Sequence, residues 1–332
     1  MRNIAKNFVL ARIARKTISY LLKIGIVLLT IWFVYRHLNH NQNLFEFVNR
    51  IHQIGQTQFY TVIIAVTILM FVNWILEAAK WQYLTKLLEK MSLWKAIEAV
   101  FCGLTMAIIT PNRIGEYGGR ILYLPVRKRV HGIFAMAVGS FGQNTVTNVI
   151  GTLSLVCFIY KYLNLNSWLS LSLTFLAMVF IFLMLLFYFR IRWLVFLLDK
   201  IKFLKKYHRF FSIMAKYSFP QLVVIMLFSL ARFAVFSSQY YILIHILLPD
   251  LHFIPVMLMV FNLFFIQSAI PSLDLLDIGV RNFIANYLFG FITTQSVAIM
   301  ACVSCIWLIN LIIPALLGSV FVLKLNFFGN NT

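Results

Sequence analysis

The chain has 332 residues, of which 62% are hydrophobic and only 11% are charged, whereas soluble domains carry about 25% charged residues. This composition excludes a water-soluble fold, because so much apolar surface needs lipid as its solvent. The net charge of +20 would favour a nucleic acid partner in a soluble protein, but in a membrane protein the basic residues first fix the orientation of the loops. We therefore expect the bilayer, and not nucleic acid, to be the partner.

Apolar windows of about 20 residues predict six membrane-spanning helices. A basic N-terminal segment, 1–17, precedes them, and we interpret the first window as a retained span because no small-residue cleavage site follows it. The six predicted spans cover 18–35, 58–79, 132–160, 168–189, 220–248 and 296–323.

Two shorter apolar stretches, 93–110 and 256–270, each run into a proline that is followed by polar residues and a glycine. Proline removes a backbone donor and clashes inside a helix, so neither stretch continues as an uninterrupted helix. Each stretch either crosses the membrane once and exits at its proline, or breaks near mid-depth and returns through the following arm, 114–125 or 278–292. The residues expected at the breaks are Pro111, Gly115, Pro271 and Gly279.

The distribution of charge favours the hairpin alternative. With both stretches as hairpins and the N-terminus in the cytoplasm, the inside loops are rich in Lys and Arg, and the loop 190–219 alone carries eight of them. The outside loops hold only three, as the positive-inside rule requires of a protein of the cytoplasmic membrane. If 93–110 crossed fully, the basic cluster within 113–129 would lie outside instead.

The hairpin interpretation gives two halves, 18–160 and 168–325, whose elements match one for one. Because the first half begins inside and the second begins outside, the halves form an inverted repeat, an arrangement found in many secondary transporters. We therefore predict an all-α polytopic membrane protein. It has six full spans and two broken, re-entrant hairpins within a single integral membrane domain.

The two breaks predict a polar site inside the membrane. Backbone groups freed by a broken helix can be satisfied only by protein or by a water-filled cavity, so the breaks should face a shared interior. Helical arms that restart there direct N–H groups and a partial positive charge toward this interior, which suits phosphate or carboxylate. Arg113 and Arg120 add full charges and planar donors. A phospholipid or lipid-linked headgroup fits this chemistry.

Few ionisable residues fall inside the predicted spans. Arg232 lies near mid-depth, where charges are rare and usually face a partner, and Asp274 and Asp277 are the nearest plausible counter-ions. This pairing has two interpretations: it is part of a pathway for a headgroup or a proton, or it holds the second hairpin in place. The pairing of Glu116 with its neighbouring arginines has the same two interpretations. The predicted substrate-binding residues are Arg113, Glu116, Arg120, Arg232, Asp274, Asp277 and Arg281.

The remaining polar residues are expected to be structural. Glu77 lies near the predicted end of its span, where its carboxylate can reach the interface at little cost. The polar residues of 143–148 share one helical face and are expected to hold helices together, although the same face could line a cavity. The four cysteines lie in apolar segments without a cluster of metal ligands, so we expect no metal and no cofactor.

The sequence around the first break resembles the Pro-x-Arg-x-Gly-Glu marker of a flippase-like family, which shares the transmembrane region of lysylphosphatidylglycerol synthases. The residues that carry this resemblance are Pro111-Asn112-Arg113-Ile114-Gly115-Glu116, with Arg120. Pro271 with Asp277-Ile278-Gly279-Val280-Arg281 resembles the second marker of that family. The resemblance covers roughly 18–325 and implies a role in moving or handling lipid headgroups. No soluble aminoacyl-transfer domain is attached, which argues against synthase activity, and Asn282 stands where some relatives have Glu.

Three functions are consistent with these features. The first is a lipid transporter or flippase in which the two hairpins form a cationic site and one half rocks against the other. The second is a membrane-embedded transferase or hydrolase acting on a lipid-linked substrate, but the sequence has no HExxH, GxSxG or Walker motif. The third is an accessory or scaffold subunit for a cell-envelope enzyme. We favour the transporter, which is not an enzyme.

Overall fold

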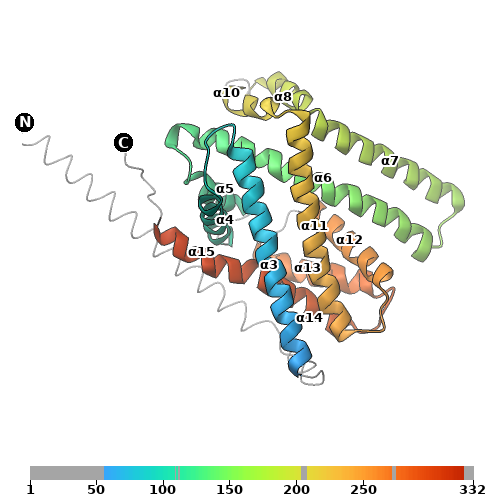
Figure 1. Cartoon of the computed structure of the whole chain (residues 1–332). Coiled ribbons are helices and arrows are strands. Elements are labelled where there is room, and N and C mark those ends of the chain that lie inside the picture. The colour runs from blue at the N-terminus through green and yellow to red at the C-terminus, as the bar shows by residue number, and fades with distance from the viewer. Residues whose placement is uncertain (1–55, 109, 111–112, 203–207, 271–273, 325–332) are drawn as a thin grey trace, which may run out of the picture.

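The computed structural model describes residues 56–108, 110, 113–202, 208–270 and 274–324, with the side chains of 56, 274–277 and 324 excepted. The regular elements of the described part are all helices (Figure 1). Its first elements are α3 (Gln56–Thr85), α4 (Leu93–Ile108), α5 (Ile114–Ile121), η2 (Val126–Lys128), α6 (Arg129–Tyr162), α7 (Ser167–Phe189), α8 (Ile191–Lys200) and α10 (His208–Phe211). There follow η3 (Ser212–Lys216), α11 (Phe219–Leu247), α12 (Phe253–Ala269), α13 (Asp274–Phe289), α14 (Ser296–Trp307), the π-helical η4 (Leu308–Ile312) and α15 (Ile313–Lys324).

Four of the described helices are long and apolar enough to cross a membrane: Thr57–Thr85, Ser167–Phe189, Phe219–Leu247 and Ser296–Leu323. The last is the continuous run of α14, η4 and α15, and it is largely buried inside the protein. By contrast, α7 exposes large apolar side chains, including Trp168 and Phe175, along most of its length, as expected for a helix that faces lipid. The expectation of an all-α, multi-pass membrane protein is confirmed. The predicted span 18–35 and the segment 1–17 lie outside the described residues.

The long helices run between two ends of the molecule. Tyr217 Oη, just before α11, donates to the carbonyl of Leu84 near the end of α3, whereas Gln239, late in α11, donates to Val66, early in α3. These pairs show that α3 and α11 are antiparallel neighbours, as Figure 1 also shows.

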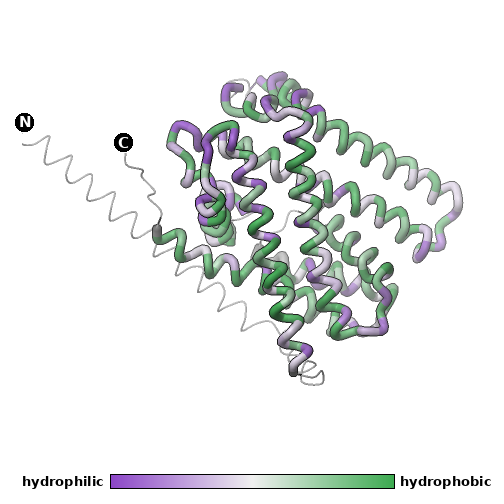
Figure 2. Tube along the Cα trace, viewed as in Figure 1, coloured by the Kyte–Doolittle hydropathy of each residue, from purple (hydrophilic) through white to green (hydrophobic). Residues whose placement is uncertain are grey.

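Basic residues gather at one of these ends, which we call the basic end and which comprises 86–92, 122–131, 190–202 and 208–218. Lys128 binds Glu89 across two of these segments, and the bond holds the pKa of the Glu89 carboxyl below its ordinary value. Figure 2 shows hydrophilic segments concentrated here. The described basic residues of this end are Lys86, Lys90, Arg127, Lys128, Arg129, Arg190, Arg192, Lys200, Lys202, Arg209 and Lys216.

The opposite end, which we call the far end, comprises 163–166, 248–252 and 290–295. Among the described residues at or beside it, Lys161 supplies the lone Lys or Arg charge. The asymmetry of charge between the two ends is the one that the sequence predicts for the two sides of the membrane.

The first predicted hairpin is a reversal of the chain entered from the basic end. An added Cβ at Gly115 would lie 2.0 Å from the carbonyl oxygen of Met106, and one at Gly119 would lie 2.5 Å from Cα of Gly103. Later residues of α5 therefore face earlier residues of α4, and the two arms touch backbone to backbone. Only glycine permits this approach.

The second hairpin is entered from the far end. Along α12, Asn262 contacts Ser154 and Ser268 contacts Asn148, so α12 runs away from the end of α6. After α13, Phe291 returns to pack on Phe158, near that end. The two hairpins thus enter from opposite ends of the molecule.

One expected break residue is placed incorrectly by the sequence prediction. Gly279 lies inside α13, which already begins at Asp274, and an added Cβ there would meet nothing within 4 Å. A single glycine costs a helix only about 1 kcal/mol, so it does not end one by itself. The interruption lies between α12 and α13, and Pro271 and Pro111 are outside the described residues.

Candidate functional site

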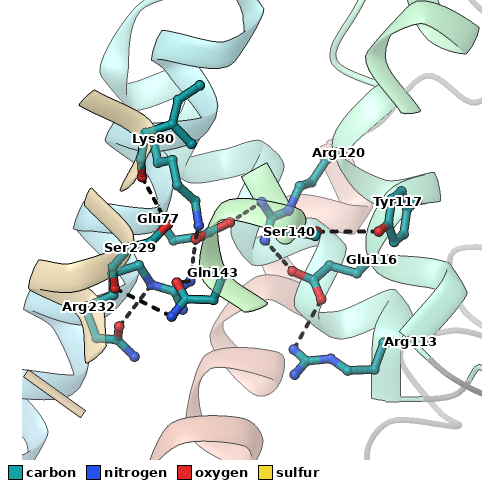
Figure 3. Close-up of polar contacts among 12 residues, drawn as sticks. Glu77, Lys80, Arg113, Glu116, Tyr117, Arg120, Ser140, Gln143, Ser229 and Arg232 are labelled. Carbon is teal, nitrogen blue, oxygen red and sulfur yellow. Dashed lines mark hydrogen bonds and ion pairs between the residues drawn. The ribbon is translucent and has the colours of Figure 1, made fainter. Parts of the chain in front are cut away.

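Glu77 of α3 is the centre of a buried ion-pair network (Figure 3). Its Oε2 lies 2.7 Å from Lys80 Nζ and also accepts from Arg232 Nη1 of α11, while its Oε1 lies 2.6 Å from Arg120 Nη1 of α5. Its side chain is 8% exposed, and those of Lys80 and Arg120 are each 2% exposed. One carboxylate therefore pairs with cations from three helices, and these pairs hold α5 and α11 against α3.

A second carboxylate extends the network toward the first break. Glu116 of α5 pairs with Arg120, and its other oxygen lies 3.2 Å from Arg113 Nη2. Arg120 bridges Glu77 and Glu116, so the two carboxylates share one guanidinium. The Arg113 side chain is 37% exposed, far more than the Arg120 side chain. Arg113 is therefore the cation of this network that a ligand reaches most easily.

The backbone at Arg113 is strained. It has φ 56° and ψ 27°, the left-handed conformation, at the residue that precedes α5, and it is the single non-glycine residue with positive φ in the described chain. Such conformations are uncommon for residues with a Cβ and collect at binding and active sites. The adjacent turn is closed by Thr110, whose hydroxyl accepts from the Gly115 N–H at 2.7 Å.

Arg232 has described partners that we had not predicted. Besides Glu77, its guanidinium donates to Asn73 Oδ1 at 3.0 Å and to Gln143 Oε1 at 3.3 Å, and it lies 5.3 Å from the ring of Trp74. The side chains of Asp274 and Asp277, the expected counter-ions, lie outside the described residues.

The interpretation of Glu77 as a residue near a span end was wrong. The helix continues to Thr85 instead of ending near 79, which places the carboxylate deep among cations. The sequence signal was present, because Glu77 and Lys80 are three residues apart on one face of an apolar helix. The hydropathy window ended too early to show that both are interior.

A cavity of about 620 Å³ lies beside this network, a size typical of small-molecule sites. Its polar lining includes Arg113, Glu116, Arg232 and Arg281, so the structure brings residues of both hairpins and of α11 to one space. Its remaining lining residues are Asn73, Trp74, Glu77, Lys80, Tyr117, Met136, Ser140, Gln143, Asn144, Thr147, Phe233, Phe236, Phe264, Gln267, Ser268, Ile306, Trp307, Asn310 and Leu311.

The cavity is both cationic and amphipathic. In the part of the chain that the structure describes, the site combines five basic side chains (Lys80, Arg113, Arg120, Arg232 and Arg281) with two carboxylates, Glu77 and Glu116. Positive charge is therefore in excess. The aromatic rings of three phenylalanines form an apolar section of the same lining: Phe233, Phe236 and Phe264. An anionic group with an attached apolar chain complements such a space.

The polar residues of 143–148 on α6 do both things that we had expected: they line this cavity and bond to neighbouring helices. Gln143, Asn144 and Thr147 belong to the lining, and Gln143 also contacts Arg232. The contact between Asn148 and Ser268 is a helix-to-helix bond of the kind that we predicted.

Among the described residues, no group of His, Cys, Asp and Glu side chains is arranged to hold a metal ion. The described buried charges instead pair with one another, and the surplus among these described side chains is positive. Fold and site together define a multi-pass membrane protein with two broken helical hairpins that meet at a charged interior cavity.

The sequence profile of the lysylphosphatidylglycerol synthase TM region matches residues 20–318. The chain therefore belongs to the family that shares this membrane region, as the motifs at the first and second breaks indicated. Membership makes it a membrane protein related to lipids. No curated protein and no solved structure matches the chain.

Proposed function

We propose that the protein is a flippase-like transporter that moves the headgroup of an anionic phospholipid or lipid-linked substrate through the cavity between its hairpins. The observation that carries this proposal is the shared lining: Arg113 of the first hairpin, Arg232 of α11 and Arg281 of the second hairpin all border one cavity. Guanidinium groups are suited to phosphate because their planar N–H groups bind two oxygens at once.

The aromatic section of the lining supports a lipid substrate in preference to a free anion. An apolar surface lies beside the cations and is formed by Phe233, Phe236 and Phe264. The first carbons of an acyl chain would pack on this surface while the phosphate remains among the arginines. Family membership points in the same direction, since the shared membrane region is that of a lipid-modifying synthase.

In this proposal Glu77 and Glu116 balance charge and do not catalyse a reaction. Glu77 is occupied by three cations and holds the helices together, whereas Glu116 competes with the substrate for Arg113. Entry of a phosphate would release Glu116 from Arg113, and departure of the phosphate would restore the pair. The two hairpins would then move with the opposed halves of an inverted repeat to alternate access, with the basic end and the N-terminus in the cytoplasm.

The test is lipid translocation in proteoliposomes made with the purified full chain. Headgroup-labelled anionic, zwitterionic and aminoacylated phospholipids are added in turn, and the labelled fraction that changes leaflet is measured. Wild type should translocate at least one anionic lipid. If none of these lipids changes leaflet faster than in protein-free vesicles, the proposed function is wrong.

Three variants test the site: Arg113→Ala, Glu116→Ala and Arg281→Ala. Arg113→Ala and Arg281→Ala should each lower translocation by about tenfold or more, the value of one charge-assisted hydrogen bond to the phosphate. Glu116→Ala should lower it too, because Arg113 then has no carboxylate to return to when the phosphate departs. None of the three should lose membrane insertion. Arg127→Ala is the matched control, because Arg127 is exposed at the basic end, away from the cavity. Normal transport by all three cavity variants would show that the site is assigned incorrectly.

A further inference from the structure

A short helix at the basic end, α8, has an apolar face that no described segment covers. It follows α7, whose exposed apolar side chains face lipid. Between the two helices, Arg190 has φ −102° and ψ 42°, far from the values of an α-helix. The span therefore ends at Phe189, and α8 starts anew at Ile191 beside the end of the span (Figure 1).

One face of α8 is fixed to the protein. Ile191 and Val195 are four residues apart and share this face, and both are buried in the main hydrophobic core. Arg192 Nε donates to the carbonyl of Ala215, in η3, at 3.3 Å. The orientation of α8 is therefore defined, and its opposite face is turned away from the core.

The opposite face carries large apolar side chains. Trp193, Phe196, Leu197 and Ile201 are each between 46% and 59% exposed. The first three lie at i, i+3 and i+4, so they share one helical face. Single exposed apolar residues are normal on a protein surface, but a contiguous group of them marks a surface that contacts another molecule or a membrane.

Basic residues border this apolar face. Lys200 Nζ lies 4.8 Å from the centroid of the Phe196 ring, and Lys202 is exposed just beyond the end of α8. The single carboxylate of the segment 190–202, that of Asp199, is already hydrogen-bonded to His208 Nδ1 at 2.6 Å. The surface is therefore apolar and cationic at once.

This combination fits the boundary between headgroups and acyl chains. Interfacial helices bury an apolar face among the first acyl carbons while their Lys and Arg remain at the level of the phosphates, and Trp is enriched at this depth. Basic clusters at a membrane surface attract anionic lipids. A second protein could also cover an apolar face, but α8 directly follows a lipid-facing span, which brings the bilayer beside it. Lipid is therefore the occupant that the position of α8 favours.

We propose that α8 lies in the headgroup layer at the basic end and binds anionic phospholipids there. Trp193, Phe196 and Leu197 pack among the first acyl carbons, and Lys200 and Lys202 contact the phosphates. This lipid is a constituent of the membrane surface and is not the lipid of the cavity. The inference goes beyond the proposed function, because it holds whether or not the protein transports a lipid.

The test measures which lipids surround α8 in the purified full chain in nanodiscs. Cys157, which is exposed, is replaced by serine, and Leu197→Cys in this background is labelled with a fluorophore. The phosphatidylcholine nanodiscs contain the same fraction of a spin-labelled quencher, either phosphatidylcholine or phosphatidylserine, with the spin label at the headgroup end of the acyl chain. Both lipids should quench the fluorophore. The local concentration of phosphatidylserine should be about three- to fivefold higher, the effect of one basic residue near a membrane surface.

Two charge variants locate the effect. Lys200→Gln combined with Lys202→Gln should lower the preference for phosphatidylserine by at least about half, while quenching by phosphatidylcholine remains because the apolar face is unchanged. The matched control combines Lys90→Gln with Arg127→Gln, which removes two exposed charges of the same end outside α8, and the preference should survive in it.

Three results would overturn the inference without bearing on the proposed function. Absence of quenching by either lipid would show that α8 is covered by water or by another protein. Equal quenching by both lipids would show that its charges serve only to orient the protein. A preference that the α8 variant keeps, or that the control variant loses equally, would show that α8 is not the site.

Discussion

Replacing Glu77 by Gln tests the network on which the site is built. The carboxylate contacts Lys80 Nζ at 2.7 Å and Arg120 Nη1 at 2.6 Å, and it also accepts from Arg232. Glutamine keeps the size and one acceptor oxygen but removes the negative charge. Three cations, two of them almost fully buried, would then lie together with Glu116 as the nearest remaining counter-charge.

The expected loss of stability is large for an isosteric change. Removing one partner of a buried ion pair costs about 3–5 kcal/mol, because the remaining charge is buried without compensation. Since Glu77 serves three cations, we expect the loss to lie at the upper part of this range. A second substitution, Lys80→Met, should recover part of it by removing one unpaired charge, and the two changes should therefore be strongly non-additive.

Unfolding is followed by titrating the purified protein in mixed micelles with a denaturing detergent, with Glu77→Gln, Lys80→Met and the double variant side by side. Glu89→Gln is the control, because Glu89 pairs with Lys128 at the surface of the basic end and exposed pairs contribute little. If Glu77→Gln is as stable as Glu89→Gln, or if the double variant shows simple additivity, the network does not hold the helices as we argue.

Three further predictions concern the hairpin and the topology. Gly119→Ala should lower stability by about 1–3 kcal/mol, as overpacking does, because the added Cβ would lie 2.5 Å from the backbone of α4. Gly118→Ala should be tolerated, because its Cβ would meet only a methionine methyl at 3.8 Å. The unfolding midpoints of the two variants in detergent titrations test this, and equal midpoints would contradict it. Arg113→Gly should be more stable than Arg113→Ala by about 1 kcal/mol, because only glycine adopts φ 56° freely. Both variants should lose transport. The reverse order of their unfolding midpoints would refute the predicted order of stability. Cysteines at Arg127 and Lys161 should be labelled by impermeant reagents from opposite sides of the membrane, and labelling from one side would overturn the two-ended arrangement.

Periodicity and hydropathy were enough to predict most helices of the described chain. Thr110-Pro111 and the glycines after it located the first reversal, because proline and closely packed glycine act through the backbone. Gly279 was misassigned since a glycine within a helix looks the same in sequence as one that ends it. The inverted repeat as a whole stays a prediction, because its first span lies outside the described residues.

The site was harder to predict than the fold. Arg113, Glu116 and Arg281 were singled out as residues beside the breaks, and they line one cavity. Spacing indicates that Glu77 and Lys80 can pair, but it does not predict the other two partners of Glu77, Arg120 of α5 and Arg232 of α11, which are distant in the sequence. Which charges meet is decided by tertiary packing, and a single sequence carries little information about it.

The central claim is that cations of both hairpins and of α11 border one cavity that receives an anionic lipid headgroup. An experimental density map of the protein in nanodiscs that contain phosphatidylglycerol tests it most directly. We predict density for a headgroup between Arg113, Arg232 and Arg281, with its acyl chains leaving along Phe233 and Phe264. A map at comparable detail in which these arginines lie apart, or in which ordered lipid occupies only the outer surface and the cavity is filled by side chains, would contradict the account.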